Sequence, residues 1–184
     1  MIQVINKPTL TGQRVTLRAP TLGDVPARFE LGNTPEIQRM FGSDPSQARD
    51  ITQSAAEFWV KSHIDDPAAW AIDVDDTLIG AVRLYGVNHA DKRANIAIGI
   101  LSEAHLGKGF GTEAMLTLAR HAFNDMKLHR LSSRVLAFNE RAIASYEKVG
   151  FQQEGRERQS ALIGATWHDE MIMGLLSSDL ADVT

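Results

Sequence analysis

The sequence predicts a mixed α/β fold, in which a mostly antiparallel central sheet of about seven strands carries helices on both faces. Three observations support this prediction. Segments typical of strands and helices follow one another in the order strand, two or three helices, three strands, helix, strand, helix, two strands. Short polar turns join the three central strands, as in an antiparallel meander. The strand–helix–strand unit from Asn95 to Phe138 then predicts a right-handed crossover.

The first part of the chain is expected to hold one strand followed by helices. Val15–Arg18 alternates in the manner of a strand. Thr21 begins a helix, with Asp24 as its capping-box partner and Phe29 facing inward. A short helical piece begins at Pro35. The longer helix after it is expected to bury one face, made of Ile51, Ala55, Phe58, Trp59 and Ser62.

The second part is expected to hold the other strands and two helices. The strands are expected at Trp70–Val74, Leu78–Val87, Asn95–Leu101, Leu131–Phe138, from Phe151 onward, and at His168–Leu176. A helix from Gly111 to Met126 presents one apolar stripe, made of Met115, Leu118, Ala119, Ala122, Phe123 and Met126. Asn139 caps a further helix, which Gly150 ends.

Composition limits the kind of protein. The 184 residues are 43% hydrophobic and 23% charged, which predicts one domain over residues 1–176 with a tail at 177–184. The net charge of −4 disfavours a nucleic-acid partner. Without cysteine, neither a disulfide, a zinc–thiolate site nor an acyl-cysteine intermediate can form. The absence of a signal peptide or an apolar span predicts a cytoplasmic protein without a membrane partner.

Three alternating glycines separate an apolar strand from the amphipathic helix that follows it. Glycine accepts positive φ and has no Cβ, so backbone N–H groups at such a turn can approach an anion, and the helix dipole adds positive charge there. The spacing G-x-G-x-G differs from both the dinucleotide fingerprint and the P-loop. We therefore expect a pyrophosphate to contact Leu106, Gly107, Lys108, Gly109, Phe110, Gly111 and Thr112.

Two segments resemble hallmarks of the GNAT superfamily of acyl-CoA-dependent N-acyltransferases. Leu106–Ala114 is similar to its pyrophosphate motif, R/Q-x-x-G-x-G/A, with Leu106 in place of the polar residue. Asn139–Phe151 resembles N-x-x-[SA]-x-x-x-Y-x-x-x-G-F. Within the superfamily the chain looks most like the RimJ/RimL branch, whose members acetylate ribosomal-protein N-termini, polyamines and other small amines.

The resemblance implies a cofactor cleft beside the strand Asn95–Leu101. In the family this strand bends at a bulge, here expected at Gly99, and splays from the next strand, so that the pantetheine arm fills the gap. The backbone N–H groups of Gly99, Ile100 and Leu101 would then bind the arm and the thioester carbonyl. On the residues alone, a close crossing of two backbones explains Gly99 equally well.

The motif around Asn139 implies roles for three side chains. Tyr146 would donate a proton to the CoA thiolate, because a thiol titrates near ~8.5 and a phenol near ~10. The alternative for Tyr146 is a buried tyrosine that only packs. Asn139 and Ser145 would lie near the cofactor arm.

The general base is not evident. Many relatives carry a glutamate on the bulged strand, where this sequence has Ala97 and Asn95, and we expect Asn95 to hold a water that relays the proton. His105, Glu103 and His168 are further candidates. A weak base predicts an α-amine acceptor, because at pH 7 an α-amine is neutral far more often than a lysine. The six histidines show no metal-binding spacing, so no metal is expected.

These observations predict an enzyme that transfers the acetyl group of acetyl-CoA directly to a primary amine, in a ternary complex. The amine site is expected between the helices of residues 25–62 and the hairpin of residues 155–167, with Trp59, Trp70 and Trp167 as candidate contacts. The sequence does not decide whether the chain forms a homodimer. One alternative is a non-catalytic acyl-CoA-binding regulatory domain, which the missing strand carboxylate favours. The other, a nucleotide-binding oxidoreductase, is disfavoured by the glycine spacing.

Overall fold

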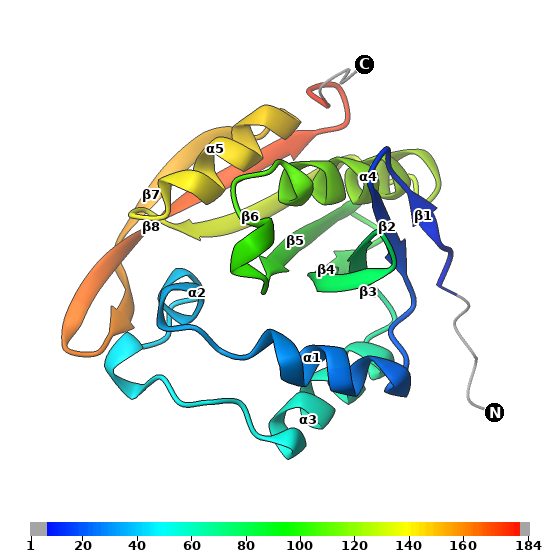
Figure 1. Cartoon of the computed structure of the whole chain (residues 1–184). Coiled ribbons are helices and arrows are strands. Elements are labelled where there is room, and N and C mark those ends of the chain that lie inside the picture. The colour runs from blue at the N-terminus through cyan, green and yellow to red at the C-terminus, as the bar shows by residue number, and fades with distance from the viewer. Residues whose placement is uncertain (1–6, 181–184) are drawn as a thin grey trace.

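The computed structural model describes residues 7–180 and contains one eight-stranded sheet (Figure 1). Its strand order is β1-β2-β3-β4-β5-β6-β8-β7, and only the β5–β6 pair is parallel among the neighbouring pairs. The strands are β1 (Leu10–Thr11), β2 (Val15–Arg18), β3 (Ala69–Val74), β4 (Thr77–Asn88), β5 (Arg93–Ile100), β6 (Arg130–Leu136), β7 (Gln152–Ile163) and β8 (Thr166–Leu176). The predicted mixed fold is confirmed. β1 was not predicted, because a strand of two residues is too short to show alternation.

Helices cover both faces of the sheet, as the sequence predicts. α1, α2 and α3 lie on one face, and α4 and α5 lie on the other (Figure 1). The helices are η1 (Leu22–Asp24), α1 (Val25–Leu31), α2 (Pro35–Met40), η2 (Pro45–Gln47), α3 (Gln53–Asp65), η3 (Glu103–His105), α4 (Phe110–Asn124) and α5 (Glu140–Val149). α4 connects the parallel strands β5 and β6, so its ends lie at the two ends of this pair.

The apolar stripe predicted for α4 is confirmed. Met115, Leu118, Ala119, Ala122 and Phe123 are all buried against the sheet. Met126 lies beyond the helix and is half-buried. Because burying these side chains removes apolar surface from water, the stripe fixes how α4 lies on the sheet. It thereby fixes the position of the glycine turn in front of α4.

The inward faces predicted for α1 and α3 are wrong. Phe29 is 41% exposed and Phe58 is 75% exposed. α3 instead buries Ala56 and Val60, and α1 buries Arg28. Phe58 lies two residues from each buried position, which corresponds to about 200° around a helix. Side-chain size is therefore a poor guide to the buried face of these two helices.

The predicted separation of two central strands is confirmed. β5 and β6 pair at only three positions, Arg93↔Arg130, Ala94↔Leu131 and Asn95↔Ser132. Beyond these pairs both strands continue without pairing to each other. The sheet is therefore open between the carboxyl-terminal halves of β5 and β6.

The bulge predicted at Gly99 is not present. Gly99 pairs with Ala81 in regular step with its neighbours. The register of β4 against β5 shifts further along, near Gly86, whose φ is 59°. Gly99 instead lies where two backbones approach, because a Cβ on Gly80 would lie 2.0 Å from the Gly99 carbonyl oxygen. This close approach requires glycine at position 80, whereas a Cβ on Gly99 itself would meet the Phe41 ring, 2.6 Å from Cζ.

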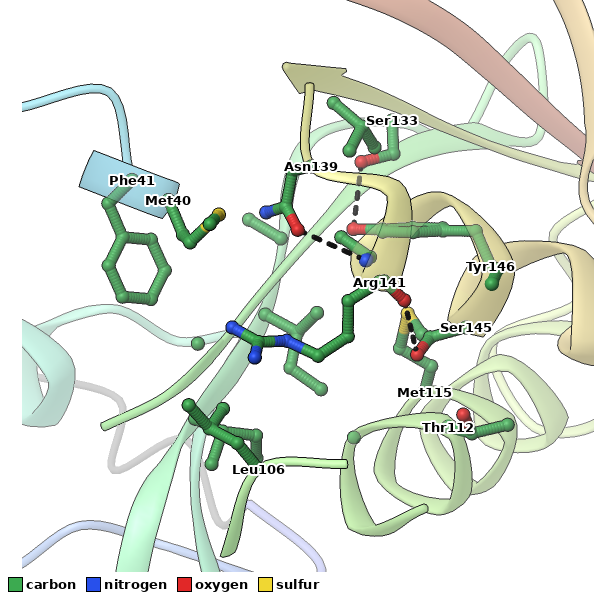
Figure 2. A pocket seen from close by; sticks show the side chains of 18 of the residues that line it. Met40, Phe41, Leu106, Thr112, Met115, Ser133, Asn139, Arg141, Ser145 and Tyr146 are labelled. Carbon is green, nitrogen blue, oxygen red and sulfur yellow. Dashed lines mark hydrogen bonds between the residues drawn. The ribbon is translucent and has the colours of Figure 1, made fainter. Parts of the chain in front are cut away.

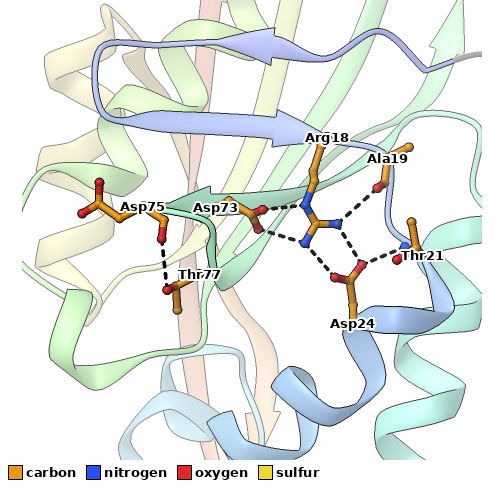
Figure 3. A network of polar contacts seen from close by, with 7 residues as sticks. All are labelled: Arg18, Ala19, Thr21, Asp24, Asp73, Asp75 and Thr77. Carbon is orange, nitrogen blue, oxygen red and sulfur yellow. Dashed lines mark hydrogen bonds and ion pairs between the residues drawn. The ribbon is translucent and has the colours of Figure 1, made fainter.

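An ionic cluster fastens the first helical turn to the edge of the sheet (Figure 3). Arg18 on β2 donates to Asp73 on β3 (Nε to Oδ2, 2.5 Å) and to Asp24 of η1 (Nη2 to Oδ1, 2.7 Å). Asp24 also accepts from the backbone N–H of Thr21 at 2.7 Å, as expected for a capping box. The cluster therefore joins the neighbouring segments β2 and η1 to β3, where Asp73 lies 55 residues after Arg18.

Candidate active site: a cleft where two strands separate

A cleft of about 480 Å³ lies where β5 and β6 separate (Figure 2). Met40 and Phe41 of the α2 segment lie on one side of it, and Asn139, Arg141 and Tyr146 lie on the other. The turn before α4 closes one end. Most residues predicted to form the site line this cleft, namely Gly99, Ile100, Leu106, Gly107, Gly109, Phe110, Gly111, Thr112, Asn139, Ser145 and Tyr146. Asn95, Leu101 and Lys108 are not part of its wall.

The glycine turn has the backbone conformation that its sequence requires. Gly107 and Gly109 have φ of 71° and 85°, which side chains with a Cβ rarely adopt. Gly109 is the N-cap of α4 and supplies no side-chain acceptor to the first N–H groups of this 15-residue helix. The first N–H groups of a helix have no acceptor within the helix, and the residues that carry them here line the cleft, where an anion can accept from them. The turn is therefore suited to hold a phosphate group.

A basic side chain that the sequence did not single out supports this turn. Arg14 of the β1–β2 turn donates to the Lys108 carbonyl (3.2 Å), and its Nε lies 2.9 Å from Glu113 Oε2. Glu113 also accepts from the backbone N–H of Val15 at 3.1 Å. Burial alone would raise the pKa of Glu113, but these donors outweigh it and hold the pKa below its usual value. Glu113 thus stays ionised and ties the β1–β2 turn to α4.

The backbone of β5 offers hydrogen-bond donors to the gap. The Leu101 N–H donates to the Ile79 carbonyl at 2.8 Å, so this predicted donor is already used inside the sheet. Donors alternate in direction along an antiparallel strand. The N–H groups of Ile98 and Ile100 therefore point away from β4, towards the space that β6 has left, whereas that of Gly99 points towards β4. Of the three N–H groups expected as donors, only that of Ile100 faces the gap. The Ile98 N–H also faces the gap, but it was not predicted.

Tyr146 lies at the back of the cleft. It is only 4% exposed, and its hydroxyl accepts from Ser133 Oγ at 2.9 Å. Burial raises the pKa of Tyr146 to about 12, although the bond from Ser133 lowers it. The phenol is therefore protonated at neutral pH. Because Ser133 supplies the hydrogen of their shared bond, the Tyr146 hydrogen is available to a group in the cleft.

Asn139 and Ser145 line the cleft but already make local bonds. Asn139 Oδ1 accepts from the Ala142 N–H at 3.2 Å and caps α5. Ser145 Oγ donates to the Arg141 carbonyl at 3.0 Å. Their remaining polar atoms could still meet a ligand, since the Asn139 amide nitrogen and the lone pairs of Ser145 are not used in these two bonds.

The candidates for the general base are dispersed. The Asn95 amide lies beside Gly86, outside the cleft wall. His168 packs on Phe138, with ring centroids 4.9 Å apart, and is also outside it. His105 is half-buried and does line the cleft, with Nδ1 2.7 Å from Ser102 Oγ. Glu103 is exposed.

The tryptophans expected at the amine site do not line this cleft. Trp70 is buried, and its Nε1 donates to the Pro8 carbonyl at 2.9 Å. Trp59 stacks on His63, and Trp167 is 55% exposed on the β7–β8 hairpin. Ordinary apolar residues take their place in the wall, namely Ile37, Met40, Phe41 and Tyr85. No periodic pattern marks these residues, so sequence reasoning missed them.

The charged side chains of the cleft wall are mostly basic. Arg134, Arg141 and Lys148 carry positive charge, and Glu170 is the one carboxylate that lines the cleft within residues 7–180. Over the same residues, no group of three or more His, Cys, Asp or Glu could hold a metal ion. No helix in the described part of the chain has the length and apolar character needed to cross a membrane. Because Arg134, Arg141 and Lys148 outnumber the single carboxylate, the cleft wall suits an anionic ligand.

Comparisons with known proteins agree with this geometry. Residues 14–152 match the family model of the acetyltransferase (GNAT) domain. The probable N-acetyltransferase YjcK of Bacillus subtilis is 34% identical over 57% of this chain and 58% of its own. The spermidine N(1)-acetyltransferase of Vibrio cholerae is 30% identical over 90% and 94%. A crystal structure of spermidine N-acetyltransferase from Vibrio cholerae with CoA and spermine superposes with a TM-score of 0.74 at 27% identity, covering 90% of this chain and 97% of that one.

Proposed function

The chain belongs to the GNAT family of acetyltransferases, and from this premise we propose that it transfers the acetyl group of acetyl-CoA directly to a primary amine within a ternary complex. The observation that carries the proposal is the cleft at the β5–β6 separation, with unpaired strand donors on one wall and the glycine turn at its end. Direct transfer is supported by the absence of cysteine, which excludes an acyl-cysteine intermediate.

The charge of this cleft and the donors along its wall suit acetyl-CoA. The first N–H groups of α4 and the turn at Gly107–Gly109 would bind the pyrophosphate. The N–H groups of Ile98 and Ile100 would bind the pantetheine arm and the thioester carbonyl, where a donor stabilises the oxyanion that forms. Arg141 and Lys148 would offset the charge of the phosphates.

The role of Tyr146 is that of a hydrogen-bond donor to the leaving sulfur. A thiol titrates near ~8.5, so with the pKa of Tyr146 at about 12 the sulfur is the weaker base by about 3.5 units. Complete proton transfer is then uphill by roughly 5 kcal/mol. A hydrogen bond to the developing thiolate needs no such transfer, and Tyr146 is in the protonated state that donates it.

We infer the class of the acceptor from the related acetyltransferases and from the residues available beside β5. We propose a peptide or protein N-terminus or a small amine, as in the RimJ/RimL-like branch. An α-amine is favoured over a lysine, because only the neutral amine attacks and no strand carboxylate is present to deprotonate a lysine. The lysine costs about 3.5 kcal/mol more to deprotonate at pH 7.

Thiol release from acetyl-CoA tests this proposal. The panel contains N-terminal peptides, polyamines and aminoglycosides, and it includes one peptide with a free N-terminus beside the same peptide blocked and carrying a lysine. We expect release with at least one amine and a higher kcat/KM for the free N-terminus at pH 7. A higher value for the blocked lysine peptide would refute the α-amine preference. Acetyl-CoA binding without release over the whole panel would point to a regulatory domain instead.

A further inference from the structure

The cleft wall on the α2 side is apolar and exposes two aromatic side chains. Phe41 is 51% exposed and Tyr85 is 39% exposed. Large apolar side chains that reach solvent inside a cleft are typical of a binding site. Ile37 and Met40 of α2 continue the same wall.

Phe41 lies against the middle of the exposed strand. A Cβ on Gly99 would be 2.6 Å from Phe41 Cζ, so the ring rests on the β5 backbone at this glycine. The Phe41 N–H donates to the Ile37 carbonyl at 3.2 Å, which anchors the residue to the end of α2. Ile98 and Ile100, the proposed binders of the thioester, flank Gly99 in the sequence. An amine that reaches the thioester from the α2 side therefore has to pass Phe41.

The charges of the cleft do not suit a polycation. Glu170 Oε2 already accepts from Arg134 (2.9 Å) and from Ser160 Oγ (3.0 Å). Arg134 and Arg141 add positive charge to the wall. A polyamine such as spermidine carries about three positive charges at neutral pH, since its amines titrate near the value of lysine. Each charge would need a carboxylate partner to offset the free energy that is lost when its hydration is removed.

We propose that the acceptor carries one positive charge and an apolar, preferably aromatic, body that binds against Phe41, Met40 and Tyr85, and that polyamines are poor substrates. This inference rests on the proposed N-acetyltransferase activity. It assigns to Phe41 the role of setting acceptor specificity. It also separates this chain from relatives that act on spermidine.

The first experiment compares thiol release by the full chain with 2-phenylethylamine, ethanolamine and spermidine, and with peptides that begin with Phe or with Asp. We expect kcat/KM to be at least tenfold higher for 2-phenylethylamine than for the other two small amines, and at least tenfold higher for the Phe peptide than for the Asp peptide. A higher value for spermidine, ethanolamine or the Asp peptide overturns the inference while leaving acetyl transfer intact. No release with any amine refutes the proposed function as well.

The second experiment uses Phe41→Ala with Phe58→Ala as its control. Phe58 is 75% exposed and is not part of the cleft wall. Phe41→Ala should raise KM for the best apolar amine about tenfold, with unchanged affinity for acetyl-CoA, and Phe41→Leu should recover part of the loss. Phe58→Ala should change neither value. An unchanged KM in a Phe41→Ala protein that melts like the wild type would overturn the role of Phe41.

Discussion

The Tyr146 hydroxyl has two roles: it makes a hydrogen bond inside the core, and we propose that it donates a second hydrogen bond to the leaving sulfur. It accepts from Ser133 inside the core, and its own hydrogen can reach the cleft. We predict that Tyr146→Phe lowers kcat by about 10²-fold or more, the range for loss of one hydrogen-bond donor to a developing negative charge, with little change in acetyl-CoA affinity. The same change leaves the buried Ser133 hydroxyl without its partner and should cost about 1–3 kcal/mol of unfolding free energy.

A second substitution separates these two effects. In Ser133→Ala/Tyr146→Phe no hydroxyl is left unpaired, so stability should return while kcat stays low. Urea unfolding and single-turnover acetylation measure the two quantities. A kcat within about twofold of wild type, with chemistry limiting the rate, would show that Tyr146 only packs.

Gly109 allows a test of the phosphate site. Its φ of 85° disfavours a side chain, and so does Arg14, whose Nη2 atom lies 3.2 Å from the position that a Cβ would take. Gly109→Val should lower acetyl-CoA affinity at least tenfold, about 1.4 kcal/mol. Gly32→Val is the matched control, because Gly32 also has positive φ (68°) but has no atom within 4 Å of a Cβ and lies outside the cleft. Calorimetry that finds equal losses for both variants would assign the effect to backbone strain rather than to the site.

At the scale of elements, the ionic cluster around Arg18 couples β2, β3 and η1 (Figure 3). Burial alone would raise the pKa of Asp24, but the bonds from Arg18 and Thr21 outweigh it and hold the pKa below its usual value. A carboxyl whose pKa is lower in the folded chain adds stability above its unfolded pKa of about 3.9. That stability is lost as the pH falls through the folded pKa.

Asp24→Asn should therefore cost about 2 kcal/mol near pH 7, because the half-buried Arg18 guanidinium loses one of its two carboxylate partners. The difference from wild type should shrink as the pH is lowered below about 4. Asp75→Asn is the control: Asp75 is exposed, and asparagine accepts its positive φ of 48° as readily. Urea unfolding between pH 7 and 3 measures both. A constant difference between Asp24→Asn and wild type over that range would contradict the assignment.

The elements also show what local sequence can predict. The stripe on α4 was predictable because five large or small apolar residues recur on one side of a long helix. The prediction for α3 failed because the large apolar residue Phe58 faces solvent while the smaller Ala56 and Val60 pack. The glycine turn and Tyr146 were predictable because each belongs to a motif with fixed local spacing.

The rest of the site depends on tertiary contacts. Phe41 and Glu170 reach the cleft from segments about 130 residues apart, and neither belongs to a local pattern. The direction of each β5 N–H depends on the register with β4, so the sequence predicted Gly99 and Leu101 as donors, although their N–H groups point towards β4, and it missed Ile98. Burial, which sets the pKa of Tyr146, is likewise a property of the folded chain.

At the scale of the whole molecule, the open sheet predicts a local response to acetyl-CoA. The N–H groups of Ile98 and Ile100 lack a strand partner, whereas that of Leu101 is bonded to Ile79. Binding should slow hydrogen exchange at Ile98 and Ile100 at least tenfold and change Leu101 much less. Residue-resolved exchange by NMR measures this. Equal slowing at all three positions would indicate a general gain in stability instead of pairing with the arm.

The separation of β5 from β6 also affects how substrates enter the site and how products leave it. Its walls include α2 from one face of the sheet and α4 and α5 from the other, so the opening passes through the sheet (Figures 1 and 2). With acetyl-CoA bound along β5 and the glycine turn, as we propose, the side of the opening beside α2 is left for the amine. We therefore expect the two substrates to bind in either order, and CoA and the acetylated product to leave in either order.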